Sequence, residues 1–236
     1  MTIPRPLLWL ALGGIVLAVG WLLVEPNVGR AEWEITAESP RVVGDALDAF
    51  AYAGGDPVRP VAGSATARVS PGDAEGIVRV TVESDEPAAP LSLRDSTVAG
   101  RSWELLARID DSSDFWIDTS IGGDTGLGEG RLPETAVRIA GQARFDLIVD
   151  GNRRRIGLSG LWSVADAVRR DDGSIRQRGL IFTPLLRDQS GFSDPSRLEL
   201  TLLLYKDGPG SNVLLHLVFF DVTIERSPAD PSPPPN

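Results

Sequence analysis

Cysteine is absent from this sequence, and histidine is almost absent, with His216 as the single example. Without cysteine the chain cannot form disulfides, use a thiolate nucleophile or bind zinc through sulfur. Any Ser-His-Asp triad would have to include His216. A zinc site would lack the several nitrogen or sulfur ligands that it needs. We therefore expect no bound metal and no cofactor.

Motifs of catalysis are missing too, since no GxSxG, HExxH or DxDxDG pattern occurs in the 236 residues. The most glycine-dense stretch, GGDTGLGEG at 122–130, has no Walker lysine, so it is not expected to cradle phosphate. Asp118, Asp124 and Glu129 could offer oxygens to calcium, but their spacing fits no calcium loop, and a loop between strands is the simpler interpretation. We expect no catalytic activity, although two carboxylates that come together only in the folded protein cannot be recognised in a single sequence.

Basic residues are outnumbered: 23 Lys and Arg stand against 33 Asp and Glu, which gives a net charge of −10. An acidic chain repels phosphate backbones, so we expect no nucleic-acid partner. The one basic cluster, Arg153-Arg154-Arg155, falls at an expected hairpin tip. It either meets anionic lipid or an acidic partner, or forms a solvated turn paired with Asp146 or Asp150.

An uncharged apolar run, PLLWLALGGIVLAVGWLLV, covers Pro6–Val24. Its 19 residues span about 28 Å as a helix, close to the thickness of a bilayer's hydrocarbon core. Arg5 before the run and Glu25 after it predict a single-pass protein with a cytoplasmic N-terminus and the rest of the chain outside. The alternative is a signal peptide cleaved after Ala31, since residues 29 and 31 are the small ones that a signal peptidase reads. That reading predicts a secreted protein.

Composition divides the chain into three parts. Residues 1–31 form the membrane anchor or signal segment. Residues 227–236, SPADPSPPPN, hold five prolines in ten residues, so a disordered or polyproline II tail is expected. Residues 32–226 between them are expected to form one exported domain.

Apolar and polar residues alternate repeatedly within 32–226, which is the period of β-strands. The clearest pair of strands is 198–205 and 213–226, joined across the turn-rich segment KDGPGSN. In the second strand one face, taken as the interior, is expected to hold Leu214, His216, Val218, Phe220, Val222 and Ile224. A second hairpin is expected to join 145–149 to 154–162 across Asp150-Gly151-Asn152, and a third to join 163–168 to 175–182.

Four further strands are expected at 61–70, 76–83, 102–110 and 115–120. Only 42–52 hints at a helix. Strands at this spacing, without the long helices that parallel crossovers need, predict an all-β, antiparallel domain. The choice between a β-barrel and a β-sandwich stays open, because strand order and closure leave no period in a sequence.

Large aromatic side chains and the single histidine are the candidates for a binding site. If the domain encloses a cavity, we expect its lining to include Trp103, Trp116, Phe145, Trp162, His216 and Phe220. The alternative is an ordinary core, where Trp and Phe most often lie. For His216 it is a buried core position with one hydrogen-bond partner.

The segment 140–154, AGQARFDLIVDGNRR, resembles the hairpin of YceI-like proteins, in which a strand leads through a Leu-x-x-x-Gly-x-Thr-Arg/Lys turn into a returning strand. Segments 76–83, 115–120 and 181–192 loosely resemble other parts of that family. Two departures are that Asn152 and Arg153 stand where the family has threonine, and that only the beginning of an Arg-Asp-x-His element remains, at 93–96. The resemblance implies a lipocalin-like barrel that binds a long apolar molecule such as an isoprenoid, and it carries over no catalytic residue.

Two functions fit these features better than catalysis by carboxylates does. One is an exported β-domain that binds an apolar ligand, such as a lipid or isoprenoid, in a pocket of about 300–1,000 Å³. The other is an assembly module that engages another cell-envelope protein through its loops or a sheet edge. An assembly module predicts a filled interior with an exposed apolar patch or an unpaired strand edge.

Overall fold

The computed structural model describes residues 31–44, 59–73, 75–83, 100–109, 114–122, 134–172, 193–205 and 213–227. Within these ranges lie ten strands and one short 3-10 helix, η3 (Pro71–Asp73). The strands are β1 (Glu32–Gly44), β2 (Arg59–Pro60), β3 (Ala62–Ser70), β4 (Glu75–Glu83), β5 (Ser102–Ile109), β6 (Phe115–Gly122), β7 (Glu134–Val149), β8 (Asn152–Ala167), β9 (Asp194–Tyr205) and β10 (Val213–Ser227).

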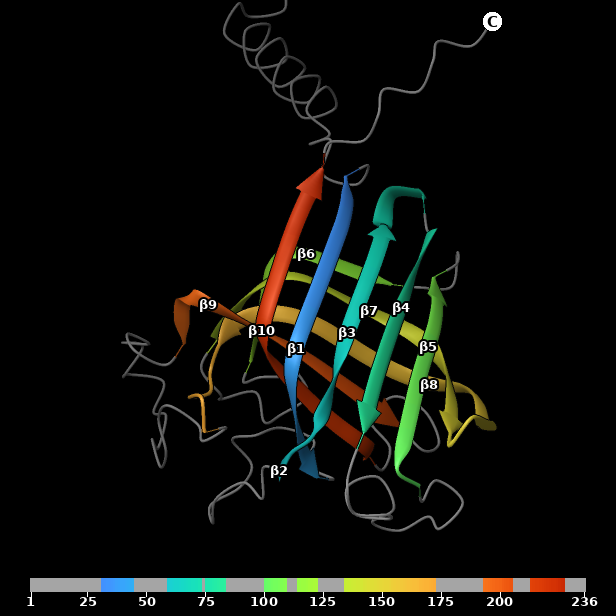
Figure 1. Cartoon of the computed structure of the whole chain (residues 1–236). Helices are drawn as coiled ribbons and strands as arrows, with labels where there is room; N and C mark the ends of the chain where they lie inside the picture. Colours follow the sequence, from blue (N-terminus) through green and yellow to red (C-terminus); the bar gives the residue numbers. More distant parts are fainter. Residues whose placement is uncertain are drawn as a thin grey trace, which may run out of the picture.

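Eight of the strands close into an antiparallel barrel in the order β10-β9-β8-β7-β5-β4-β3-β1, and β1 returns to pair with β10. In Figure 1, β10, β1, β3, β4 and β5 run side by side, while β7, β8 and β9 cross behind them. β6 lies off this path and pairs with β7, and the two-residue β2 pairs with β1. The all-β expectation is confirmed, and the open choice between barrel and sandwich is decided in favour of the barrel.

Each of the eight barrel strands contributes alternate apolar side chains to one core cluster. β1 shows the pattern: Trp33, Ile35 and Ala37 join the core, while the glutamates at 32 and 34 are exposed. This alternation is the period of a strand with one face buried. Burying a large apolar side chain contributes roughly 1.5–3 kcal/mol, so the packed interior is the main source of stability.

β7 and β8 form the longest hairpin, with 16 residues in each strand. Its turn, Asp150-Gly151, has φ values of 48° and 74°, and positive φ at both positions is typical of the type I′ turn that Asp-Gly favours. The predicted hairpin is confirmed. The predicted division after Trp162 is wrong, because no turn-forming residue interrupts the alternation there and β8 continues to Ala167.

The other predicted strands agree with β3, β4, β5, β6, β9 and β10. β1 is not predicted by the sequence analysis, and its last residues, Val42–Gly44, lie where the analysis expects a helix to begin. The remainder of that helix, the strand at 175–182, the N-terminal apolar run and the tail from 228 lie outside the described residues. Within the described ranges no helix is long and apolar enough to cross a membrane.

The beginning of β1 and the end of β10 lie at the same end of the barrel, because Glu32 pairs with Ser227 (Figure 1). The turn between β3 and β4 is also at this end, since β1, β3 and β4 stay in antiparallel register there. The Asp150-Gly151 turn is at the opposite end, where Val149 pairs with Trp103. The first residue of β1 and the last residue of β10 therefore lie side by side.

Candidate interaction surface

Three of the six predicted lining residues, Trp103, Phe145 and Trp162, are in the barrel core and at most 1% exposed. Phe145 and Trp162 also pack against the backbone of a neighbouring strand. A Cβ atom placed on Gly160 would lie 2.6 Å from the Phe145 ring, and one placed on Gly141 would lie 3.0 Å from the Trp162 indole. Contacts this short mean that the two rings lie directly against the backbone of these glycines, with no room for a methyl group between them.

The other three, Trp116, His216 and Phe220, do not face this core. Trp116 lies on β6 and is 40% exposed. On β10, residues 215, 217 and 219 point into the core, so His216 and Phe220 lie on the outer face, where they are nevertheless buried. The predicted interior position of His216 is wrong. Most of residues 214–220 are apolar on both faces of the strand, so alternation alone could not identify the inner face.

β10 changes face after Phe220, because Val222 and Ile224 pack against the core again. Opposite this change, Ser39 of β1 has a φ of 53°, and its hydroxyl donates a hydrogen bond to the carboxylate of Asp221. The predicted shared face is therefore split between Phe220 and Val222. The structure does not bring the six predicted residues together around one space.

The end of β8 and most of β9 are buried on both faces, and charged groups lie among these buried residues. Arg138 donates a hydrogen bond to Asp166 at 3.0 Å, and the backbone N–H of Arg169 donates to the Glu199 carboxylate at 2.6 Å. On the same face of β9, burial raises the pKa of Tyr205 to about 12. These contacts hold strands together. In the part of the chain that the structure describes, no group of three or more His, Asp or Glu side chains could hold a metal ion.

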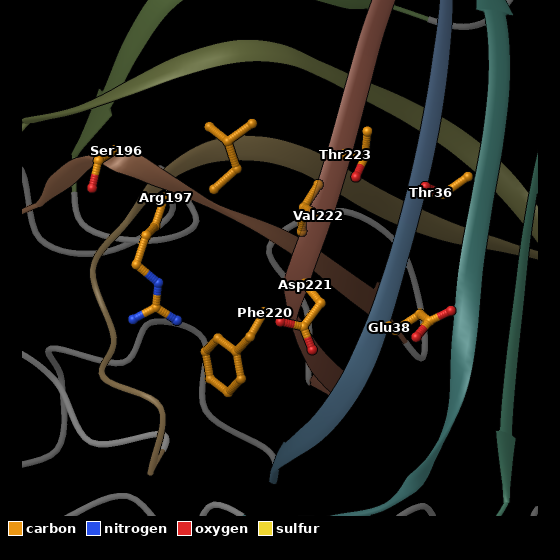
Figure 2. Close-up of a pocket in the computed structure, with 9 residues that line it drawn as sticks. Thr36, Glu38, Ser196, Arg197, Phe220, Asp221, Val222 and Thr223 are labelled. Atoms are coloured by element: carbon orange, nitrogen blue, oxygen red, sulfur yellow. The ribbon is translucent and has the colours of Figure 1, made fainter.

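A hollow of about 540 Å³ lies outside the barrel, bordered by β1, β9 and β10 (Figure 2). It is lined by Thr36, Glu38, Ser196, Arg197, Leu198, Phe220, Asp221, Val222 and Thr223. Arg197 pairs with Asp171 at 2.6 Å, and the guanidinium of Arg41 lies 5.4 Å from the centre of the Phe220 ring. Carboxylates therefore stand beside apolar and hydroxyl groups on one open surface.

Carboxylates also stand directly opposite one another where β1 and β10 close the barrel. Glu38 is in register with Asp221, and Glu34 is in register with Glu225. All four are exposed. We call these four residues the acidic seam. Like charges placed directly across two strands destabilise a sheet, so the seam is a local departure from favourable pairing.

Few cations offset the acidic seam. Arg68 of β3 lies 3.4 Å from Glu34 and shares its charge with Glu32. Glu38 and Glu225 make no ion pair with any described residue. Sequence reasoning missed this surface. The alternation in residues 32–38 carried a signal for β1, but nothing in the sequence showed that β1 pairs with β10.

β6 provides a second exposed feature. Among the described strands it pairs only with β7. Asp118 of β6, with a φ of 47°, pairs with Arg226 at 3.3 Å and so ties the strand to the end of β10. Trp116 lies two residues earlier and is exposed. An unpaired strand edge and an exposed indole are both features of protein-contact surfaces.

Together these features define a closed antiparallel β-barrel with a packed aromatic core and an acidic, hollowed outer surface. Comparison with protein-family models, with curated proteins and with solved structures found no match. The resemblance to YceI-like proteins therefore stays a prediction.

Proposed function

We propose that this chain is a membrane-tethered, non-enzymatic β-barrel that engages another protein of the cell envelope through its outer surface. The observation that carries the proposal is the packing of Trp103, Phe145 and Trp162 inside the barrel. An apolar ligand would need a pocket of about 300–1,000 Å³, whereas three of the side chains expected to line it are packed in the core and the other three do not face the core.

The outer surface supports a role in protein contact. The hollow between β1, β9 and β10 is open, and its lining mixes carboxylates, hydroxyls and an arginine with the apolar Leu198, Phe220 and Val222. Mixed polar and apolar surface of this kind is typical of protein interfaces, whereas a lipid tail needs an apolar wall. β6 adds an edge strand with the exposed Trp116.

The tether is proposed from the sequence. The apolar run Pro6–Val24 is long enough to span a bilayer, and seven residues, 25–31, separate it from β1. Such a linker reaches at most about 25 Å. A barrel held this close to the membrane would meet other envelope proteins rather than diffuse freely.

Site-specific photocrosslinking of the full-length chain tests the function. The photoreactive residue p-benzoylphenylalanine would replace Trp116 or Thr36 on the proposed surface, and Thr81 on the outer face of β4 as the control position. We expect a discrete protein adduct from one of the first two positions and none from Thr81.

Native mass spectrometry of the gently purified full-length protein tests the alternative, in which the barrel holds an apolar ligand. An apolar mass that copurifies and is lost on organic extraction, together with no position-dependent crosslink, would overturn the proposal. The barrel would then be a carrier of an apolar ligand.

A further inference from the structure

We infer that the acidic seam and the adjoining hollow bind an extended, basic segment of a protein partner. The inference rests on the proposed function and names the surface and the chemistry of the contact. It commits to a peptide segment in which two Lys or Arg side chains are four residues apart.

The first argument is the unfavourable charge arrangement of the seam. Glu38 faces Asp221 and Glu34 faces Glu225 across one pair of strands. Directly opposed like charges destabilise a sheet, while opposite charges there would stabilise it. Departures from a locally favourable choice are expected where a protein carries out its function. A basic partner would turn both repulsive pairs into attractive ones.

The second argument is the spacing of the two acidic pairs. They are four residues apart on each strand, which corresponds to about 13 Å along a strand. Thr36 and Thr223 face each other midway between them. An extended peptide points every second side chain to the same face. Basic side chains at positions i and i+4 would therefore reach the two acidic pairs, and the side chain at i+2 would lie over the threonines.

The third argument is the hollow beside Glu38 and Asp221. The hollow is an open space of about 540 Å³ whose lining includes Glu38, Asp221 and Thr223, so a Lys or Arg side chain has room to reach the two carboxylates there (Figure 2). The positive charge of Arg197 is compensated by Asp171.

The charge of the whole molecule acts in the same direction. A net charge of −10 attracts basic segments and speeds their encounter with the surface. Glu38 and Glu225 are free of ion pairs with the described residues, so no salt bridge to a described residue has to break before a partner's cation binds them.

Fluorescence anisotropy with a synthetic peptide tests the inference on the full-length protein in zwitterionic detergent micelles. The probe is a fluorescein-labelled nonapeptide, Ser-Thr-Lys-Thr-Val-Thr-Lys-Thr-Ser, whose two lysines lie four residues apart. A first control peptide has glutamate in place of both lysines. A second has the lysines three residues apart, which puts them on opposite faces of an extended chain. Of the three peptides, we expect only the probe to bind, and its affinity should fall as salt is added.

Matched variants separate the seam from the general charge of the protein. Glu38→Gln/Glu225→Gln removes one carboxylate from each acidic pair and is expected to weaken binding of the probe about tenfold or more. Glu75→Gln/Glu83→Gln removes two exposed carboxylates of β4, with the same change in net charge, and is expected to leave the affinity within about twofold.

Three outcomes would overturn the inference. Equal weakening by both double variants would mean that only net charge matters, and equal binding of both lysine peptides would mean that no extended register is recognised. If calcium chloride alone, followed by isothermal titration, bound the parent but not the Glu38→Gln/Glu225→Gln variant while the probe did not bind, the seam would be a cation site. A persisting protein crosslink from Trp116 would leave the proposed function standing in each case.

Discussion

Single residues decide how tightly the barrel interior is packed, and Gly160 is the sharpest example. A Cβ atom there would lie 2.6 Å from the Phe145 ring and 2.8 Å from a methyl of Leu204. We expect Gly160→Ala to lower the free energy of unfolding by about 1–3 kcal/mol, because overpacking forces side chains from their preferred rotamers. Urea denaturation followed by tryptophan fluorescence measures the change.

A double-mutant cycle identifies the cause of that loss. Phe145→Leu opens space next to Gly160, so combining it with Gly160→Ala should cost less than the sum of the two single changes. Strict additivity of the two free energies would show that Gly160 and Phe145 do not compete for the same volume.

Asp150 is the single residue for which we predict a pH-dependent contribution to the stability of the fold. Its carboxylate accepts hydrogen bonds from the backbone N–H groups of Arg101 and Ser102, each at 3.0 Å, and these bonds lower its pKa below the ordinary 3.8. A carboxylate with a lowered pKa in the folded state stabilises the fold above its unfolded pKa, and this contribution is lost as the pH falls through the folded pKa.

We therefore expect Asp150→Asn to be less stable than the parent at about pH 7 and to approach the parent's stability toward about pH 2. Asparagine tolerates the positive φ at this turn position, so the turn itself is kept. Urea midpoints of both proteins across this range measure the gap. A gap that stays constant with pH would show that the turn geometry, and not the carboxylate, makes the difference.

At the residue scale, the sequence separated core from surface well only where one face was polar. Trp33 alternates with glutamates, so the pattern carries a signal for its buried position, although no strand was predicted there. His216 has apolar neighbours on both sides, and its face was decided by the register of β10 with β1 and β9. An alternation with a period of two residues cannot show which face points inward when both faces of a strand are apolar and buried.

At the scale of the elements, the β1–β10 pair contains an unfavourable cross-strand contact between two glutamates. We expect Glu225→Gln to raise the free energy of unfolding by about 0.2–1 kcal/mol, because it removes the repulsion from Glu34 across the strands. The gain should shrink at about 1 M salt, where exposed charges are screened. Thermal unfolding at low and high salt measures both effects.

Glu83→Gln is the control for this prediction, since Glu83 is exposed on β4 and lies opposite Ala62 and Ser102 rather than another acid. An equal gain in stability from Glu83→Gln would mean that the overall charge, and not the opposed pair, destabilises the barrel. A stabilised Glu225→Gln barrel with weaker peptide binding would be the expected sign of a seam kept for function.

Individual strands could be predicted where apolar and polar residues alternate within them. The order in which the strands pair could not be predicted. The β7–β8 turn follows from Asp150-Gly151, whose preference for positive φ is local. β1 is missed although residues 32–38 alternate, because Ser39 and Pro40 interrupt the pattern before Val42. The hollow depends on the closure of β1 on β10, which joins the two ends of the domain and leaves no trace in either segment.

For the whole molecule, the proposed tether predicts how the barrel is directed relative to a membrane. Glu32 and Ser227 are paired at one end, and the Asp150-Gly151 turn is at the other. If Pro6–Val24 spans the bilayer, the seven residues between it and β1 keep the first end within about 25 Å of the membrane. The other end is farther away by up to the length of β4, whose nine residues extend about 30 Å, since barrel strands tilt relative to the barrel axis.

Energy transfer to labelled lipids tests this orientation, and the absence of cysteine makes the labelling simple. A donor dye would be attached in Asp73→Cys, beside the β3–β4 turn, or in Asn152→Cys, beside the β7–β8 turn, with acceptor dyes on the lipids of a vesicle that holds the full-length protein. We expect strong transfer from position 73 and weak transfer from position 152, because transfer falls steeply with distance. Equal transfer from the two sites would mean that the barrel lies on its side, and the acidic seam could then face the lipid instead of a protein. Loss of all transfer, with the protein recovered free of vesicles, would mean that the chain is cleaved after Ala31 and that its partner must be sought in solution.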